Sequence, residues 1–108
     1  MGNQKVWLVT GASKGFGLEI AKAVLKSGDK VIATCRSNPE KLSAELNNDN
    51  ALAVAMDVTN EDQVKQGVED GIAKFGNLDV VVNNAGYGII AAIEEVSNEE
   101  TKRQYDTN

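Results

Sequence analysis

The sequence predicts an α/β fold in which helices cover a doubly wound parallel sheet. Short apolar segments of strand length alternate with segments whose apolar residues recur every three or four positions, the spacing of one helix face. A glycine-rich segment, residues 10–17, lies between the first expected strand and the first expected helix, where folds of this class bind phosphate. The length of 108 residues is sufficient for one domain.

The first strand, the first helix and the second strand are expected at residues 5–9, 15–26 and 31–35. The first strand is a short apolar run that ends at Thr10-Gly11. The apolar residues of the helix are Phe16, Leu18, Ile20, Ala21, Val24 and Leu25. Because they lie three or four positions apart and Gly28 follows as a helix C-cap should, this segment predicts a helix.

A second helix is expected to open at Ser37-Asn38-Pro39-Glu40, with Pro39 at its first position. Leu42 and Leu46 are spaced to face inward on this helix. Residues 47–50, three asparagines and an aspartate, predict a turn. The third strand is expected at residues 52–56.

Thr59-Asn60-Glu61-Asp62 has the form of a capping box and predicts the start of a third helix. Its apolar stripe is Val64, Val68, Ile72 and Phe75. Gly76 ends the pattern, and the nearly all-apolar residues 78–82 predict a fourth strand that is covered on both faces. A second capping box at residues 97–100 predicts a further helix that runs to the end of the sequence.

The expected order is therefore βαβαβαβ plus the start of a helix. Parallel strands joined by right-handed helical crossovers give a truncated Rossmann-type fold, the mononucleotide-binding half of a doubly wound sheet.

Composition excludes several classes of function. The chain has 11 Lys or Arg against 16 Asp or Glu, a net charge of −5 that argues against a nucleic-acid binder with a basic face. It has no histidine, which removes His-ligated metals and Ser-His-Asp triads, and we expect no metal site. No apolar run approaches the ~20 residues of a membrane span, and no signal peptide is evident. The single cysteine, Cys35, cannot form an internal disulfide, so a cytoplasmic location is expected.

The glycine loop Thr10-Gly11-Ala12-Ser13-Lys14-Gly15-Phe16-Gly17 is the main functional signal. Its glycines allow a tight turn and a close approach of backbone to ligand. The helix that follows offers unpaired N–H groups and a partial positive charge to a pyrophosphate. We therefore predict dinucleotide binding in preference to a purely structural turn.

Three other interpretations of the loop are less favoured. Residues 11–15 match the Gly-x-Ser-x-Gly elbow of hydrolases, but the chain lacks the histidine which that chemistry needs. A P-loop requires Gly-Lys-Ser/Thr after its spacer, and this pattern is absent. A methyltransferase-type site would have an acidic residue at the end of the second strand, where Arg36 stands.

Arg36 favours NADP over NAD. It lies 19 positions after Gly17, where an NAD site usually has Asp or Glu for the ribose 2′-hydroxyl. A cation at this position can pair with a 2′-phosphate through charge-assisted hydrogen bonds, and Lys14 can add a second positive charge. The alternative is that both side chains are solvated surface cations.

Residues after the third and fourth strands are expected to face the same crevice, because the carboxyl ends of parallel strands lie at one edge of the sheet. Asp57, followed by Val58, can accept a hydrogen bond from an adenine amine, or it can satisfy local backbone N–H groups before Thr59. Asn83-Asn84-Ala85-Gly86 offers small residues that leave room for ribose and nicotinamide, and asparagine amides that can tie neighbouring strands.

In combination, the glycine loop, Asp57 and Asn83-Asn84-Ala85-Gly86 resemble the short-chain dehydrogenase/reductase family over essentially the whole chain. The resemblance implies a pyrophosphate on the glycine loop, adenine at Asp57, ribose beside residues 84–86, and an NADP preference from Arg36 and Lys14. It also places Asn108 in the family's catalytic set, where it would help organise a proton-relay water. The expected cofactor-binding residues are Gly11, Ser13, Lys14, Gly15, Phe16, Gly17, Arg36, Asp57, Val58, Asn84, Ala85 and Gly86.

The chain departs from the family in lacking the catalytic Ser and the Tyr-x-x-x-Lys pair, because Tyr87 is followed four positions later by Ala91 and Tyr105 would need a residue beyond Asn108. In the family's chemistry this Tyr exchanges the proton while hydride moves to or from nicotinamide. The 108 residues are therefore expected to be the NAD(P)-binding portion of an oxidoreductase that acts on a small-molecule carbonyl or secondary alcohol, and to be inactive alone. The alternatives are a non-catalytic NADP-binding module and an inactive truncated fragment.

An open edge on the fourth strand would expose unpaired backbone groups to other chains. Homo-oligomerisation or self-association is expected for that reason.

Overall fold

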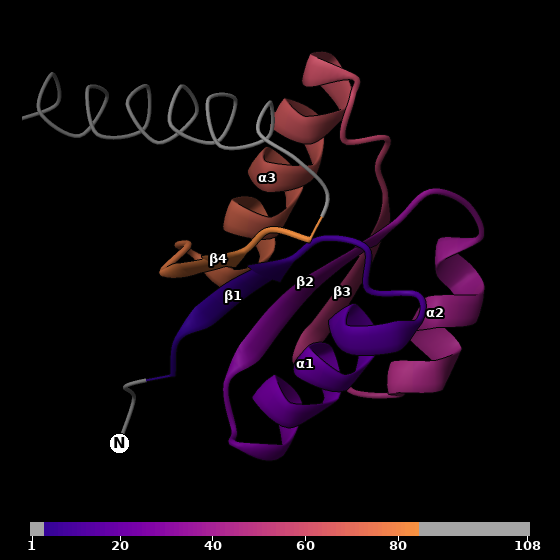
Figure 1. The fold of residues 1–108 in the computed structure, drawn as a ribbon. Helices are drawn as coiled ribbons and strands as arrows, with labels where there is room; N and C mark the ends of the chain where they lie inside the picture. Colours follow the sequence, from indigo (N-terminus) through magenta and orange to yellow (C-terminus); the bar gives the residue numbers. More distant parts are fainter. Residues whose placement is uncertain (1–3, 85–108) are drawn as a thin grey trace, which may run out of the picture.

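Residues 4–84 are described by the structure, a computed structural model (Figure 1). The strands are β1 (Val6–Val9), β2 (Lys30–Cys35), β3 (Ala51–Ala55) and β4 (Val80–Val82). The helices are α1 (Gly15–Lys26), α2 (Pro39–Leu46) and α3 (Glu61–Phe75). The elements therefore alternate along the chain as the periodicity predicts.

All four strands are parallel, in the order β3-β2-β1-β4. Leu8 pairs with Ile32 of β2 on one side and with Val81 of β4 on the other, so β1 lies in the interior of the sheet. This order and the covering helices confirm the doubly wound, Rossmann-type fold. Parallel pairing also brings the carboxyl ends of all four strands to one edge, where the predicted site residues follow them.

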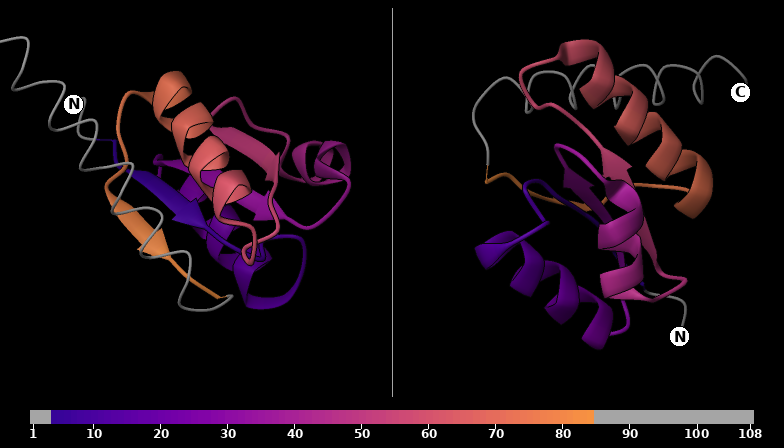
Figure 2. Two further views of the ribbon diagram at one scale, coloured as in Figure 1. Left: turned by 90° about the horizontal axis from the view of Figure 1, so that it is seen from above. Right: turned by 90° about the vertical axis from the view of Figure 1, so that its right-hand side faces the viewer.

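The sheet separates two apolar layers. On one face α1 packs against β1 and β2, and α2 packs against β2 and β3; on the other face α3 is the one helix within residues 4–84 (Figure 2). The buried residues of the first layer are Val9, Ala12, Ala21, Val24, Val31, Ala33, Cys35, Leu42 and Leu46. Those of the second layer are Val6, Leu8, Ile32, Met56, Val64 and Val68. Alternate residues of β1 and β2 thus enter opposite layers, as the period of two in a strand requires.

The buried face of α1 differs from the apolar row in the sequence. Gly17, Ala21 and Val24 are buried, whereas Phe16, which belongs to the expected row, is 86% exposed. The physical reason is that small residues bring the helix close to the sheet, so the helix turns Gly17 inward and its neighbour Phe16 outward. Phe16 therefore lies off the buried face of the helix, although the spacing that predicted the helix is confirmed.

Asparagine side chains cap the other two helices. Asn38 accepts a hydrogen bond from the backbone N–H of Lys41 before α2, with Pro39 at the first helical position as expected. Asn60 does the same for Gln63 before α3. The expected capping box with Thr59 as N-cap is thus displaced by one residue, because the Thr59 hydroxyl is bound to Asp57 instead.

Strand boundaries differ from the expected ones by one or two residues. β3 begins at Ala51, since Ala51 pairs with Val31 of β2. β4 covers Val80–Val82 alone, and its three valines are half-buried rather than fully covered. Within residues 4–84, β4 has a neighbouring strand on one side only. The helix expected from residue 97, and any strand beyond β4, lie outside the described residues.

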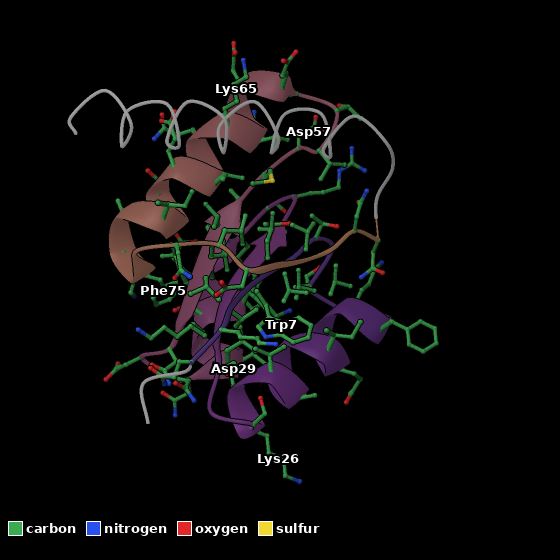
Figure 3. The ribbon with its side chains drawn as sticks, turned by 90° about the vertical axis from the view of Figure 1, so that its left-hand side faces the viewer. Trp7, Lys26, Asp29, Asp57, Lys65 and Phe75 are labelled. Carbon is green, nitrogen blue, oxygen red and sulfur yellow. The ribbon has the colours of Figure 1, made fainter. Side chains whose placement is uncertain are left out.

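The amino ends of β1 and β2 are tied by a hydrogen-bonded cluster far from the predicted site (Figure 3). The Asp29 carboxylate accepts hydrogen bonds from the indole Nε1 of Trp7 at 3.0 Å and from the backbone N–H of Lys5 at 3.1 Å. These two bonds hold the pKa of Asp29 below its ordinary value, the Lys5 bond contributing most. Asp79, just before β4, accepts from the backbone N–H of Val6 at 2.8 Å.

Two glycines let α3 lie close to the sheet. A methyl group at Gly71 would overlap Cδ1 of Ile32 and come within 2.7 Å of its Cγ1, and one at Gly67 would overlap Cε of Met56. The Ile32 side chain is branched and fully buried, so it cannot swing aside. The end of the unbranched Met56 side chain has more freedom to move.

We therefore predict that Gly71→Ala destabilises the chain by about 1–3 kcal/mol through overpacking. Gly67→Ala, its matched control on the same helix, should cost less, because a displaced Met56 and a gain in helix propensity of about 1 kcal/mol offset the contact. Urea unfolding of both variants measures the difference. Equal free energies of unfolding would contradict this account of the packing.

Candidate functional site

The glycine loop crosses the carboxyl end of β1 and leads into α1. Gly11 has a φ of 61°, in the left-handed region that favours glycine. A Cβ at Gly17 would overlap the backbone oxygen of Gly11 and come within 3.0 Å of Cα of Ala12. The first turn of α1 therefore lies directly against the loop backbone, and only a residue without a side chain permits this approach.

The amino end of α1 is left without a capping side chain. Its N-cap, Lys14, is extended and makes no side-chain hydrogen bond to the first turn, which also has no acidic residue. Helices α2 and α3 both begin with an asparagine cap and acidic residues. The N–H groups and the positive end of the helix dipole of α1 are thus available to an external anion.

Thr10 joins the ends of β1 and β4. Its buried hydroxyl accepts a hydrogen bond from the backbone N–H of Asn84 at 2.8 Å. The side-chain amide of Asn84 donates in turn to the backbone oxygen of Thr10 at 3.1 Å. The expected tie between neighbouring strands through an asparagine amide is confirmed at Asn84, which these bonds hold beside the glycine loop.

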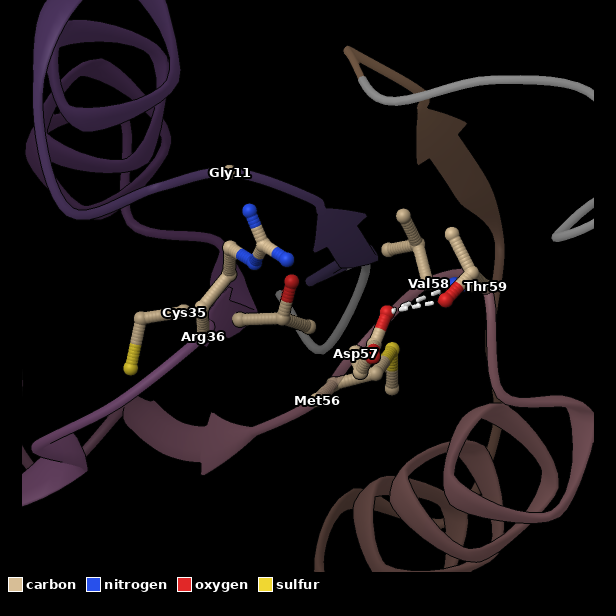
Figure 4. A pocket seen from close by; sticks show the side chains of 8 residues that line it. Gly11, Cys35, Arg36, Met56, Asp57, Val58 and Thr59 are labelled. Atoms are coloured by element: carbon tan, nitrogen blue, oxygen red, sulfur yellow. Dashed lines mark hydrogen bonds between the residues drawn. The ribbon is translucent and has the colours of Figure 1, made fainter.

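A cavity of about 300 Å³ opens at the carboxyl ends of β2 and β3 (Figure 4). It is lined by Gly11, Thr34, Cys35, Arg36, Met56, Asp57, Val58 and Thr59. Four residues predicted to bind a cofactor, from three separate segments, thus meet at one cavity: Gly11, Arg36, Asp57 and Val58. Its volume is at the lower end of the range for small-molecule sites.

Asp57 is held in place by the residue two positions later. Oδ1 of Asp57 accepts hydrogen bonds from the Thr59 hydroxyl at 2.6 Å and from the Thr59 backbone N–H at 2.9 Å. These bonds hold the pKa of the Asp57 carboxyl below its ordinary value, and the nearby Arg36 charge lowers it further. Asp57 therefore accepts a local backbone N–H, as one of the two alternatives expected. Its Oδ2, however, has no hydrogen bond to any residue in the described part of the chain.

A second, polar cavity of about 440 Å³ lies beside the glycine loop. It is lined by Ser13, Lys14, Ser37, Asn38, Lys41, Leu42 and Glu45. Neither Lys14, Lys41 nor Arg36 forms an ion pair with a carboxylate of residues 4–84; the pair found there is Lys65–Glu61. Lys14 in the loop, Arg36 after β2 and Lys41 at the start of α2 thus form no ion pair within residues 4–84, although the Arg36 charge is near enough to Asp57 to lower its pKa.

Three residues of this region, Lys41, Thr10 and Thr34, were not predicted to be site residues, although Thr10 begins the glycine loop. Lys41 lies in the first turn of α2, two positions after Pro39. The sequence pattern gave no reason to include this turn in the predicted site. Thr10 directly follows β1, and Thr34 is the second-to-last residue of β2. Both are buried, but the Thr34 hydroxyl has no hydrogen-bond partner. Two threonines at strand ends are a weak signal, since sequence alone does not distinguish a bound hydroxyl from an unbound one.

The remaining predicted residues are placed less closely around the cavities. Gly15, Phe16, Gly17 and Asn84 lie at the same edge of the sheet but line neither cavity. Ala85, Gly86 and Asn108 lie outside the described residues. Cys35 packs in the core, and burial raises the pKa of its thiol, which agrees with a packing role. Among residues 4–84, no helix is long and apolar enough to cross a membrane.

Comparison with known proteins extends these observations. A family model described as short chain dehydrogenase matches residues 5–108. The oxidoreductase BOA17 of Botryotinia fuckeliana is 46% identical over 107 residues, which cover 96% of this chain and 39% of that protein. This chain therefore spans well under half the length of that relative.

Two solved structures are similar in fold. The crystal structure of a short-chain dehydrogenase from Streptomyces avermitilis has a TM-score of 0.67 and 46% identity, with 77% of this chain and 31% of that chain covered. That of a 3-ketoacyl-(acyl-carrier-protein) reductase from Brucella melitensis, complexed with NADH, has a TM-score of 0.70 and 45% identity, with 76% and 34% covered.

The two hydrogen bonds from Thr59 predict a pH effect. Because the folded pKa of Asp57 lies below its unfolded value, the ionised carboxylate stabilises the fold above the unfolded pKa of ~3.9, and this contribution is lost as pH falls through the folded pKa. Thr59→Val removes the hydroxyl donor and should raise the Asp57 pKa measured by NMR titration. Arg36→Gln should raise it less; a larger rise with Arg36→Gln would contradict the assigned causes.

Proposed function

Because this chain belongs to the short-chain dehydrogenase family, we propose that it supplies the dinucleotide-binding part of an NADP-dependent oxidoreductase. When bound, a nicotinamide dinucleotide supplies hydride transfer to or from a carbonyl or secondary alcohol. The observation that carries the proposal is the meeting of Gly11, Arg36 and Asp57 at one cavity beside the uncapped end of α1. The class of cofactor is that of the Brucella melitensis reductase, which was crystallised with NADH.

The residues present fit a pyrophosphate on the glycine loop. The backbone of Gly11 and Ala12 occupies the space that a side chain at Gly17 would fill. With no side chain at Gly17, the first turn of α1 lies close to the loop and leaves its backbone accessible to a ligand. The N–H groups of the first turn of α1 have no competing side-chain acceptor. A pyrophosphate would complete the hydrogen bonds that this helix end leaves unmade.

The 2′-phosphate of NADP would pair with the cations of Arg36, Lys14 and Lys41, which form no ion pair within residues 4–84. Arg36 lines the first cavity together with Asp57, and the next residue in the chain, Ser37, lines the second cavity. Lys14 and Lys41 line the second cavity from the loop and from α2. A phosphate dianion here would pair with these cations through charge-assisted hydrogen bonds, whereas the ribose hydroxyls of NAD would leave them unpaired.

Asp57 and Asn84 would hold the two ends of the cofactor. The free Oδ2 of Asp57 is an acceptor suited to an adenine amine, since Thr59 already fixes the orientation of the carboxylate. Asn84 is fixed by Thr10 at the end of β4, where it, Ala85 and Gly86 would border the ribose on the nicotinamide side. Asn108 would take part in proton relay, as the family resemblance implies.

The cation assignment predicts a change of cofactor preference. Arg36→Asp should weaken NADPH binding roughly 10- to 100-fold, the equivalent of one lost charge-assisted hydrogen bond, and leave NADH binding unchanged or stronger. Titration followed by cofactor fluorescence measures both. Lys22→Asp, on an exposed position of α1, makes the same change in net charge and should leave both affinities within about twofold. Equal losses for NADPH and NADH in Arg36→Asp would overturn the NADP assignment.

We also propose that these 108 residues bind the cofactor without catalysing its oxidation, because they contain no Tyr-x-x-x-Lys to exchange the proton. Mixing the chain with NADPH and a panel of ketones should give binding but no loss of NADPH absorbance. Steady turnover, absent from a Gly17→Ala control, would contradict this part of the proposal and identify another proton donor.

A further inference from the structure

Thr34 carries the one buried side-chain oxygen or nitrogen that lacks a hydrogen-bond partner among the described residues. The residue is 1% exposed, and it lies within β2. It pairs with Val54 in the sheet, and its carbonyl accepts a hydrogen bond from the backbone N–H of Ala12 at 2.8 Å. The hydroxyl is therefore the unusual group, because a buried donor without a hydrogen-bond partner destabilises the fold.

Thr10 provides an internal comparison. It is as buried as Thr34 and directly follows β1 at this edge of the sheet. Its hydroxyl, however, accepts from the backbone of Asn84 at 2.8 Å and lies within 3.5 Å of two further acceptors, the backbone oxygen of Val82 and Oδ1 of Asn83. The fold thus satisfies one of two similar hydroxyl groups and leaves the other open.

The unpaired hydroxyl lines the cavity that holds Arg36 and Asp57. Because side chains alternate between the two faces along β2, the Thr34 side chain lies on the same face of the sheet as that of Ile32. Its cavity neighbours are apolar at Met56 and Val58 and polar at Asp57. An apolar recess with few polar groups is suited to a flat heteroaromatic ring that also hydrogen-bonds.

We propose that the Thr34 hydroxyl is a binding residue for the adenosine end of the dinucleotide, to which it supplies a hydrogen bond from the floor of the cavity. This role rests on the proposed dinucleotide function and adds a third polar group, from inside the sheet, to Arg36 and Asp57 at its edge. The bond would satisfy Thr34 only in the bound state. The nicotinamide end, expected beside Asn84, would make no use of it.

The test is the same substitution at both threonines. Thr34→Val keeps the shape of the side chain and removes a hydroxyl with no protein partner, so the melting temperature of the unliganded chain should stay equal or rise. Thr10→Val removes the acceptor of the Asn84 N–H and should lower it. A fall in Thr34→Val as large as that in Thr10→Val would overturn the claim that the Thr34 hydroxyl is unpaired before binding.

Binding supplies the second readout. Thr34→Val should weaken NADPH and adenosine 5′-monophosphate by roughly three- to tenfold, the range of one lost neutral hydrogen bond. It should leave the affinity for nicotinamide mononucleotide unchanged. Thr34→Ser, which keeps the hydroxyl, should bind the first two within about twofold of the original chain.

The outcomes separate this role from the proposed function. If the original chain binds none of the three nucleotides, the dinucleotide proposal itself fails, and the Thr34 role with it. If it binds and Thr34→Val binds equally well, the Thr34 role alone is overturned. Equal losses in Thr34→Val and Thr34→Ser would also overturn it, because the hydroxyl would then not be the cause.

Discussion

The site depends on the close contact between the first turn of α1 and the glycine loop. The oxygen of Gly11 occupies the position that a Cβ at Gly17 would need, so the helix begins almost on top of the end of β1. This contact places the backbone N–H of Ala12 on the carbonyl of Thr34 at 2.8 Å and thereby joins the loop to β2. Parallel topology brings the loop and the cavity to one edge of the sheet, and this contact sets the amino end of α1 directly against the loop.

The two ends of the sheet use polar groups in opposite ways. At the amino end, Asp29 and Asp79 accept hydrogen bonds from the Trp7 indole and from the backbone N–H groups of Lys5 and Val6, so charged groups there hold strands together. At the carboxyl end, the Thr34 hydroxyl, the cation of Arg36 and one oxygen of Asp57 have no hydrogen bond or ion pair within residues 4–84. Of these three groups only the Thr34 hydroxyl is buried, so it lowers stability in a way that a bound ligand can later restore.

The order of elements and both ends of α1 could be predicted from the sequence. The spacing of apolar residues and the glycines that flank the helix depend on local geometry alone. Prediction from the sequence was less reliable where contact with a residue distant in the chain, or with a neighbouring side chain, sets the structure. Pairing with Val31 sets the start of β3, Asp57 takes the hydroxyl expected to cap α3, and close packing at Gly17 turns Phe16 outward. The meeting of Gly11, Arg36 and Asp57 followed from parallel topology, whereas the difference between Thr10 and Thr34 depends on neighbours that no local pattern encodes.

Backbone amide NMR of the chain during addition of NADPH tests the central claim most directly, since it locates binding without relying on turnover. The account predicts the largest chemical-shift changes in residues 11–17, at Arg36 and Ser37, and at Asp57 to Thr59. Trp7 and Asp29, at the opposite end of the sheet (Figure 3), should scarcely shift. Changes confined to the Trp7–Asp29 end, or no changes at saturating NADPH, would contradict a cofactor site at the carboxyl edge.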